Sequence, residues 1–212
     1  MAAVQASTPE GVVAAVVGLV VRRQARTPGR VRVAVDGAEA ADPHTWAAAV
    51  VEGLAPGRAV QVRADRFWRP ASLRLEWGRE DEESWLDGWL DEAALVREVL
   101  EPAASGGSVL PELRDPATDR SVRAARVDLP ADGVVVVSGG VLLGRGLPFD
   151  LAVHLAMTPA ALARRTPAGR AWTLPALARY AAERDPEGAA DLVVRVDDPR
   201  HPALVRRPDG NS

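Results

Sequence analysis

The sequence contains no cysteine, no lysine and no isoleucine. Without cysteine the chain forms no disulfide, no thiolate metal site and no cysteine nucleophile. Without lysine it has no Schiff base, no lysine general base and no lysine to place on a bound phosphate. All 26 basic residues are arginine. Together with the many Ala, Val, Gly and Pro residues, this composition indicates a GC-rich genome rather than selection against lysine.

The chain also has little net charge. The chain has 26 basic and 29 acidic residues, which gives a formal net charge of −3. No overall basic field is present to attract nucleic acid, so we expect no nucleic-acid partner. Apolar residues make up 47% and charged residues 26% of the 212 residues, a balance typical of a globular domain.

The apolar run over residues 12–21 is broken only by Gly18. It is shorter than the ~20 residues that a bilayer-spanning helix needs, and no basic segment of the kind found in signal peptides precedes it. Thr8 followed by Pro9 is typical of a helix start, which predicts a helix over residues 9–26. We expect a cytoplasmic chain without a membrane partner.

A βαβ unit is predicted near the start of the chain. Residues 31–36 alternate and are rich in valine, which predicts a strand that ends at Asp36-Gly37. Apolar side chains on one face predict a helix over residues 43–54, and a second strand is predicted over 59–64. Such units form parallel sheets with right-handed crossovers.

The middle of the chain, residues 66–130, is less regular and contains four of the six tryptophans, namely Trp68, Trp77, Trp85 and Trp89. A helix is predicted over residues 91–100. Residues 102–132 are rich in Pro, Gly and Asp and are predicted to form loops or short edge strands. The four tryptophans are candidates for one apolar pocket or for ordinary core packing.

Regular patterns return in the last third. Continuous apolar runs at 134–137, 151–156 and 192–196 predict strands buried on both faces. Helices are predicted after Thr158-Pro159 and over residues 173–184. This pattern predicts a doubly wound α/β fold, with three α/β/α layers and a mostly parallel sheet. We expect an N-terminal helix packed on the core (1–28), one α/β domain (29–207, with the Trp-rich insertion 66–130) and a tail (208–212).

Several segments, taken in order, resemble those of uridine kinases. They are Val35-Asp36-Gly37 with the loop after it, Asp65-Arg66-Phe67-Trp68-Arg69-Pro70, Trp85-Leu86-Asp87-Gly88-Trp89-Leu90-Asp91, Asp115-Pro116-Ala117-Thr118-Asp119-Arg120, and 190–199 with Asp197-Asp198-Pro199. Since the order of the segments is also that of the family, the chain is identified as a uridine kinase-like member of the P-loop kinases, of an actinobacterial type. The resemblance implies a nucleoside kinase fold in which ATP and Mg²⁺ phosphorylate a nucleoside 5′-hydroxyl.

The loop that holds the ATP phosphates departs from the family pattern. The family sequence is Gly-x-x-x-x-Gly-Lys-Ser/Thr, whereas this chain has Gly37, then Asp42, Pro43 and His44 at the last three positions, followed by Thr45. Proline has no N–H to donate to a phosphate, and Asp42 places a negative charge near a polyanion. Asp42-Pro43 is also a normal helix start. Two interpretations stay open, a helix capped by its own carboxylate and an altered phosphate site.

A second acid of the family is also missing. Where uridine kinases have Asp or Glu and then Gly after the strand that corresponds to 134–137, this chain has Ser138-Gly139-Gly140. If Gly140 matches the family glycine, Gly139 replaces the acid that helps to hold Mg²⁺. The binding of ATP and Mg²⁺ is therefore implied by the resemblance alone, and no metal-binding residue is predicted.

Other family positions keep chemistry that fits a nucleoside. Asp65 matches the carboxylate that positions or deprotonates the nucleoside hydroxyl, and it is also a candidate strand-end cap or ion-pair partner. Trp68 stands at the aromatic position near the base, followed by Arg69. Asp91 matches a ribose-binding acid, and Asp87 is a second candidate for that role. Either acid is equally a candidate cap for the following helix.

Arg164 and Arg165 stand where related kinases carry lid arginines that bind phosphates, and bidentate arginine suits this role. Solvated arginines at a helix end are the alternative. We expect a short lid over residues 166–172, a buried His154 without a role in the site, and an exposed His201.

Three functions are compatible with these residues. The first is a divergent kinase that acts on a nucleoside or another small hydroxyl compound with a rebuilt donor site. The second is a protein that keeps the nucleoside pocket and has weak or no ATP-dependent activity. The third is a structural or interaction protein that uses the Trp-rich segment as an interface. Physical arguments about the loop favour the second, and homo-oligomerisation stays open.

Overall fold

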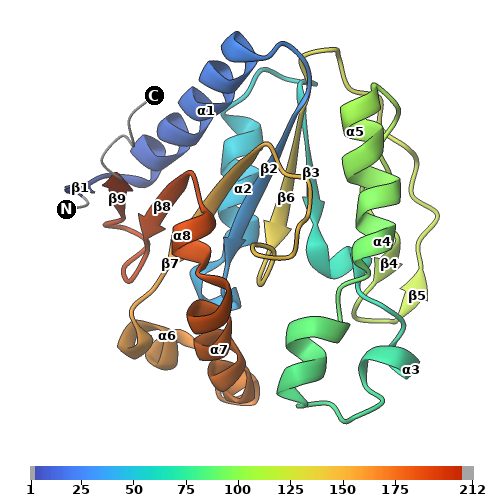
Figure 1. The fold of residues 1–212 in the computed structure, drawn as a ribbon, viewed down its shortest axis with the longest axis vertical. Coiled ribbons are helices and arrows are strands. Elements are labelled where there is room, and N and C mark those ends of the chain that lie inside the picture. Colours follow the sequence, from blue (N-terminus) through green and yellow to red (C-terminus); the bar gives the residue numbers. More distant parts are fainter. Residues whose placement is uncertain (1–2, 207–212) are drawn as a thin grey trace.

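A computed structural model describes residues 3–206, in which the central element is a seven-stranded sheet (Figure 1). Its strands are β1 (Ala3–Ala6), β2 (Val31–Gly37), β3 (Ala59–Arg63), β6 (Val134–Gly139), β7 (Leu151–Ala156), β8 (Leu192–Arg195) and β9 (Ala203–Arg206). Their order is β1-β9-β8-β7-β2-β6-β3. The strands from β8 to β3 pair in parallel, and β9 and β1 add in antiparallel fashion. A separate ribbon pairs β4 (Arg114–Asp115) with β5 (Arg120–Ser121).

Helices connect and cover these strands. They are α1 (Pro9–Arg26), α2 (Pro43–Glu52), α3 (Ala71–Arg74), α4 (Glu92–Leu95), α5 (Glu101–Ser105), α6 (Pro159–Arg165), α7 (Leu174–Arg184) and α8 (Pro186–Ala189). Shorter 3-10 turns lie at Glu39–Ala41, Ala64–Phe67 and Ala168–Thr173, and π-helical turns lie at Ser84–Gly88 and Val96–Leu100.

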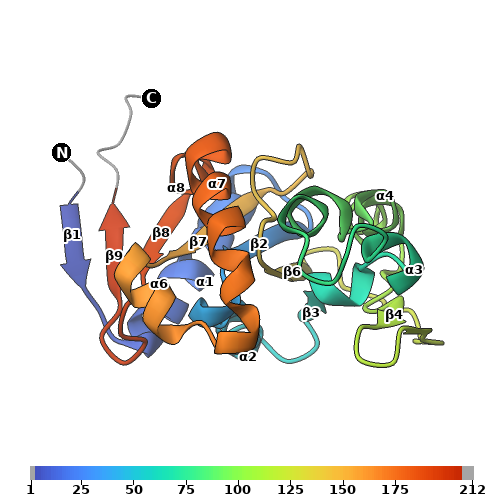
Figure 2. The same ribbon diagram turned by 90° about the horizontal axis from the view of Figure 1, so that it is seen from below.

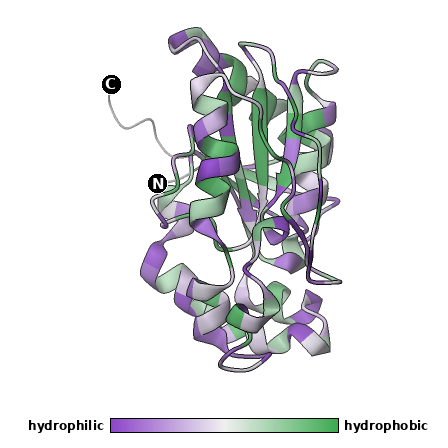
Figure 3. Ribbon diagram, turned by 90° about the vertical axis from the view of Figure 1, so that its right-hand side faces the viewer, coloured by the Kyte–Doolittle hydropathy of each residue, from purple (hydrophilic) through white to green (hydrophobic). Residues whose placement is uncertain are grey.

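The sheet is buried on both faces, as β6 shows most simply. Val134 and Val136 pack with α1 and α2 on one face, whereas Val135 and Val137 pack with α4 and α5 on the other. The α7 helix covers the same second face over β7 and β8. The strands at the centre of Figure 3 are accordingly coloured as hydrophobic. The predicted three-layer α/β/α fold with a mostly parallel sheet is therefore confirmed.

Most predicted elements form close to the expected positions. The helix over residues 9–26 forms as predicted, and the one predicted over 43–54 ends at Glu52. The helix predicted over 91–100 continues through its π-helical turn to Ser105, because Gly106 is the first residue that adopts the left-handed conformation that ends the helix (φ 81°). The prediction of loops or short edge strands over 102–132 is therefore wrong for residues 102–105, which belong to α5, whereas 107–132 form loops and the short β4–β5 ribbon as expected.

The strands at one edge of the sheet were not predicted. Segment 1–28 was expected to form a helix alone, but Ala3–Ala6 form β1, which pairs with β9 (Figure 2). Four-residue strands are too short to show a period in the sequence, and the two partners lie almost 200 residues apart in the chain. Residue 207 and the predicted tail over 208–212 lie outside the described residues.

Among residues 3–206, no helix combines the length and the apolar character that a membrane span requires. The longest helix, α1, instead packs its buried residues Val12, Val16 and Val20 against the sheet. The carboxyl ends of β2, β3 and β6 meet at one edge of the parallel sheet, and the loops that follow them converge there. Ligand sites of such sheets lie at this edge.

Candidate functional site

The loop after β2 is closed by its own side chains. Gly37 is required at its start, because a Cβ there would lie 2.8 Å from the Cβ of Leu155. Residues 39–41 form a 3-10 turn, and Asp42 adopts a left-handed conformation (φ 54°) and caps α2. The Thr45 N–H donates to Oδ1 of Asp42 over 3.3 Å. The amino end of α2, where a phosphate would bind, is thus already capped by a carboxylate.

His44 is held in place by two polar neighbours beneath the loop. Its Nδ1 lies 2.9 Å from Oγ of Ser138, and Nε2 of Gln61 donates both to that same oxygen (3.2 Å) and to the His44 carbonyl (2.8 Å). This arrangement fixes the imidazole plane and directs Nε2 toward Asp65, 4.0 Å away. Where a kinase has a Ser or Thr hydroxyl for Mg²⁺, this chain therefore presents an imidazole.

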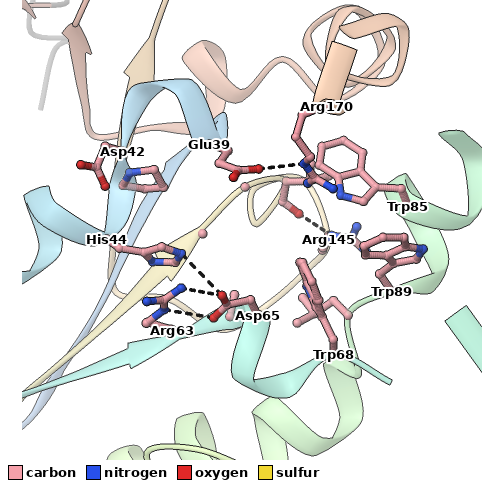
Figure 4. A pocket seen from close by; sticks show the side chains of 16 residues that line it. Glu39, Asp42, His44, Arg63, Asp65, Trp68, Trp85, Trp89, Arg145 and Arg170 are labelled. Atoms are coloured by element: carbon pink, nitrogen blue, oxygen red, sulfur yellow. Dashed lines mark hydrogen bonds and ion pairs between the residues drawn. The ribbon is translucent and has the colours of Figure 1, made fainter. Parts of the chain in front are cut away.

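Asp65 lies at the end of β3 and faces the same space (Figure 4). Its carboxylate accepts two hydrogen bonds from Arg63, with distances of 3.1 Å from Nε and 2.6 Å from Nη2. The predicted alternative of an ion-pair partner thus holds in this structure. The Asp65 side chain also lines the cavity, where it could meet a substrate hydroxyl, and its predicted role toward that hydroxyl stays a prediction.

The end of β6 leaves no room for the missing acid. A Cβ on Gly139 would lie 2.7 Å from the Cβ of Ala64, which is closer than two carbon atoms approach. A carboxylate at position 139 therefore requires that the segment after β3 move or that Ala64 become glycine. Among residues 3–206, no three His, Asp or Glu side chains gather where they could hold a metal ion.

Tryptophans form the opposite wall of the cavity (Figure 4). Trp68 and Trp89 meet edge to face with ring centroids 5.0 Å apart, and Trp172 packs against Trp85 and Trp89 at 6.1 and 6.0 Å. The prediction that Trp77 joins these rings is wrong, because this side chain is 77% exposed and lies outside the cavity. Trp77 follows the short α3, where no neighbouring element covers it.

The space between these walls has a volume of about 510 Å³. Arg145, from the loop after β6, and Arg170, from the 3-10 turn at Ala168–Thr173, also line it, in addition to Arg63. Arg170 pairs with Glu39 over 2.9 Å, and Arg145 pairs with Glu92. The cavity therefore combines aromatic surfaces with cations that already have carboxylate partners. This combination suits a planar, neutral ligand with hydroxyl groups better than a polyanion.

Several predicted site residues lie elsewhere. Asp91 is the N-cap of α4, where it accepts a hydrogen bond from the Ala94 N–H over 2.9 Å, which is the alternative that the sequence left open. Arg69 does not line this cavity; like Trp77, it lines a separate surface pocket. Arg164 and Arg165 close the end of α6 away from the cavity, and Arg165 donates to the Val196 carbonyl. The arginine that reaches the cavity from the lid segment is Arg170.

Sequence reasoning did not find Arg63, Arg145, Arg170 or Glu39 as cavity residues. Arg63 carried a signal, since it alternates with Asp65 at the end of a predicted strand. Arg145 and Arg170 carried none, because one lies in an irregular loop, the other in a short 3-10 turn, and both lie outside the predicted strands and helices.

Burial lowers the pKa of His44 below its ordinary value, and the positive charge of Arg63 adds to this effect. Because the unfolded chain, with a His pKa of about 6.5, then binds more protons, the His44 contribution to stability is lost as the pH falls below that value. The wild-type protein therefore loses unfolding free energy when the pH falls from about 7.5 to 5.5. In His44→Gln, whose side chain takes up no proton, we expect this loss to be smaller by about 1 kcal/mol or less. Urea unfolding at both pH values measures this, and equal losses in the two proteins would contradict the expectation.

No protein-family model and no curated protein sequence matches the chain. Among solved structures it is similar to that of a possible uridine kinase from Bacillus stearothermophilus, with a TM-score of 0.68 and 18% identity over 85% of this chain and 96% of that chain. The chain has the fold of the uridine kinase-like P-loop kinases.

Two other kinases with known structures share this kinase-like fold. A proposed fructose transport system kinase from a Silicibacter species has a TM-score of 0.57 and 26% identity, with 84% of this chain and 91% of that chain covered. A D-glycerate 3-kinase from Cryptococcus neoformans has a TM-score of 0.52 and 14% identity, with 82% and 80% covered. These similarities are similarities of fold and leave the reaction of this chain to its own residues.

The residues at the kinase-like loop do not fit the ATP phosphates and Mg²⁺ that the fold implies. Phosphate loops of this fold offer a row of backbone N–H groups and a lysine. Here Pro43 lacks the N–H, the Asp42 carboxylate takes the Thr45 N–H, and Gly139 has no space for an acid. The loop therefore lacks the groups that phosphoryl transfer from ATP needs.

Proposed function

We propose that the protein binds a nucleoside-type ligand in the tryptophan-lined cavity and has weak or no ATP-dependent kinase activity. The observation that carries the proposal is the Asp42 carboxylate on the amino end of α2. It occupies the anion position at the donor loop, whereas the acceptor side keeps Asp65 and an aromatic wall. The two halves of the site therefore differ. The acceptor half has side chains suited to a nucleoside, whereas the donor loop lacks the groups that bind the phosphates of ATP.

The nucleoside class follows from the two walls of the cavity. A planar base can stack on the indole of Trp68 or Trp85, and such stacking contributes about 1–3 kcal/mol per base. Ribose hydroxyls find acceptors in the Asp65 carboxylate and donors in Arg63. Among the described residues that line the cavity, Arg63, Arg145 and Arg170 each already pair with a carboxylate, so a triphosphate would have to displace these partners.

Calorimetric titration tests both halves of the proposal. We expect uridine or cytidine to bind to the purified protein and Mg²⁺–ATP to show no binding at millimolar concentration. Micromolar binding of Mg²⁺–ATP would overturn the loss of the donor site. The absence of binding by every nucleoside would overturn the proposed ligand class.

The aromatic wall gives a matched pair of variants. We expect Trp68→Ala to weaken nucleoside binding about 5- to 150-fold, in line with ~1–3 kcal/mol of stacking. Trp77→Ala is the control, because Trp77 is 77% exposed and lies outside the cavity. Calorimetry with both variants measures the two affinities. Equal weakening in both, or none in Trp68→Ala, contradicts a base on this wall.

One observation favours a second function, that of an active kinase with a rebuilt donor site. Three arginines, Arg63, Arg145 and Arg170, line the cavity of a protein that has no lysine. If they replace the loop lysine, the wild-type protein forms ADP from Mg²⁺–ATP and a nucleoside. Asp65→Asn then lowers the rate about 100-fold or more, the usual contribution of a general base. A wild-type protein that forms no ADP supports the binding function instead.

A further inference from the structure

A second cavity, of about 240 Å³, lies on the sheet face covered by α7. It is lined mainly by apolar side chains, among them Met157, Leu162 and Leu177, and by the imidazole of His154. Among residues 3–206, no side chain lines both this cavity and the tryptophan-lined one. Neither the kinase-like fold nor the proposed function gives this space a role.

Beneath the cavity lies a buried polar network centred on Asp36, the last residue before Gly37. Its carboxylate is completely buried and accepts three hydrogen bonds, from the Leu142 N–H (2.7 Å), His154 Nδ1 (2.6 Å) and the Tyr180 hydroxyl (3.1 Å). Burial and the negative charge of Asp36 raise the pKa of Tyr180, so its hydroxyl stays protonated and donates. The Tyr180 oxygen in turn accepts the Leu143 N–H over 3.0 Å.

This network fixes the orientation and the tautomer of His154. Because Asp36 accepts at Nδ1, the neutral imidazole carries its proton there and presents the lone pair of Nε2. Nε2 has no hydrogen-bond partner among the described residues, and His154 lines the cavity. The imidazole of His154 therefore offers this mainly apolar cavity an acceptor without a partner among the described residues, beside the carboxylates of Asp185 and Glu187, which have partners of their own.

We propose that this cavity is a second binding site, which takes a small neutral ligand with an apolar body and one O–H or N–H donor directed at Nε2 of His154. An apolar cavity of about 150 Å³ is enough for benzene, so a substituted ring fits the volume observed here. The carboxylates of Asp185 and Glu187 also line the cavity, one capping Gly188 and the other paired with Arg195, and they disfavour anions.

The mouth of the cavity offers variants that leave the core intact. Ala181 lines the cavity and is exposed on α7, so a tryptophan there covers the opening without entering the sheet core. Ala182, its neighbour, is also exposed but does not line the cavity. Ala181→Trp and Ala182→Trp therefore make a matched pair with the same change in composition.

Phenol and anisole are suitable probes, because they share the ring while only phenol has a donor. Ligand-observed NMR titrations should show phenol bound to the full-length protein, with anisole at least about tenfold weaker, as expected where one hydrogen bond to a buried acceptor is lost. Ala181→Trp should weaken phenol binding by about tenfold or more, and Ala182→Trp should leave it unchanged.

The proposal is overturned if phenol does not bind, if anisole binds equally well, or if the two tryptophan variants behave alike. Circular dichroism confirms that both variants fold before the titrations are compared. None of these measurements involves a nucleoside or ATP, so the result is independent of the proposed function.

Discussion

Replacing Asp42, Pro43 and His44 by Gly, Lys and Thr is expected to raise the affinity for Mg²⁺–ATP at least about a hundredfold. A lysine about 4 Å from a phosphate contributes ~4 kcal/mol at an effective dielectric constant of ~20, and each 1.4 kcal/mol is tenfold. The changes also restore the N–H at position 43 and release the Thr45 N–H from the Asp42 carboxylate. Glycine suits position 42, where φ is 54°.

A control separates the charge from the change in loop shape. In Asp42→Gly, Pro43→Met, His44→Thr the loop has the same N–H groups and a side chain of similar length, but no cation. Calorimetry with Mg²⁺–ATP measures both variants, and the lysine variant alone should bind tightly. If neither variant gains affinity, the donor site lacks more than the residues of this loop. The next change to test is then an acid at position 139, together with glycine at position 64 to make room for it.

The fold was largely predictable, because two-sided apolar strands and capped helices leave a local pattern. Val134–Val137 is an example, since a run of four valines is explained by burial on both faces of one strand. Strands β1 and β9 were not predictable, since each is four residues long and depends on a partner at the other end of the chain. Local pattern contains no information on such a pairing.

The site was predictable where a residue adjoins a strand end and for three of the clustered tryptophans, since Trp68, Trp85 and Trp89 line the cavity. Asp65 and the 37–45 loop follow strands directly, and the structure brings them to one cavity. Asp91 was assigned to the ribose from its family position, yet its local role as a helix cap uses the carboxylate. Arg145 and Arg170 come from a loop and a short 3-10 turn whose positions depend on tertiary packing, so no spacing in the sequence indicates them.

Removal of the Asp36 carboxylate is expected to have the largest effect on stability. In Asp36→Ala, the Leu142 N–H, the Tyr180 hydroxyl and His154 Nδ1 all lose their acceptor inside the protein. An unsatisfied buried donor costs about 1–3 kcal/mol, so we expect a loss of about 3–5 kcal/mol of unfolding free energy. Since domains are stable by only about 5–15 kcal/mol, this loss is a large share of the total.

Urea unfolding measures the loss, and Asp91→Ala is the matched control. Asp91 is also a carboxylate that accepts from the backbone, but it caps a single N–H, for which about 1 kcal/mol is typical. Similar losses in the two variants would mean that the Asp36 network adds nothing beyond one hydrogen bond.

Asp36 also connects stability to the candidate site. The loop that it holds through the Leu142 N–H carries Val141 at φ 60°, a conformation that β-branched residues rarely adopt and that costs about 1–3 kcal/mol. Val141 and Arg145 of this loop line the tryptophan-lined cavity. Without Asp36 the loop has less to hold it in the strained form, so Asp36→Ala should also weaken nucleoside binding in the protein that remains folded. Calorimetry well below the unfolding temperature tests this, and unchanged affinity would show that the loop keeps its shape without the carboxylate.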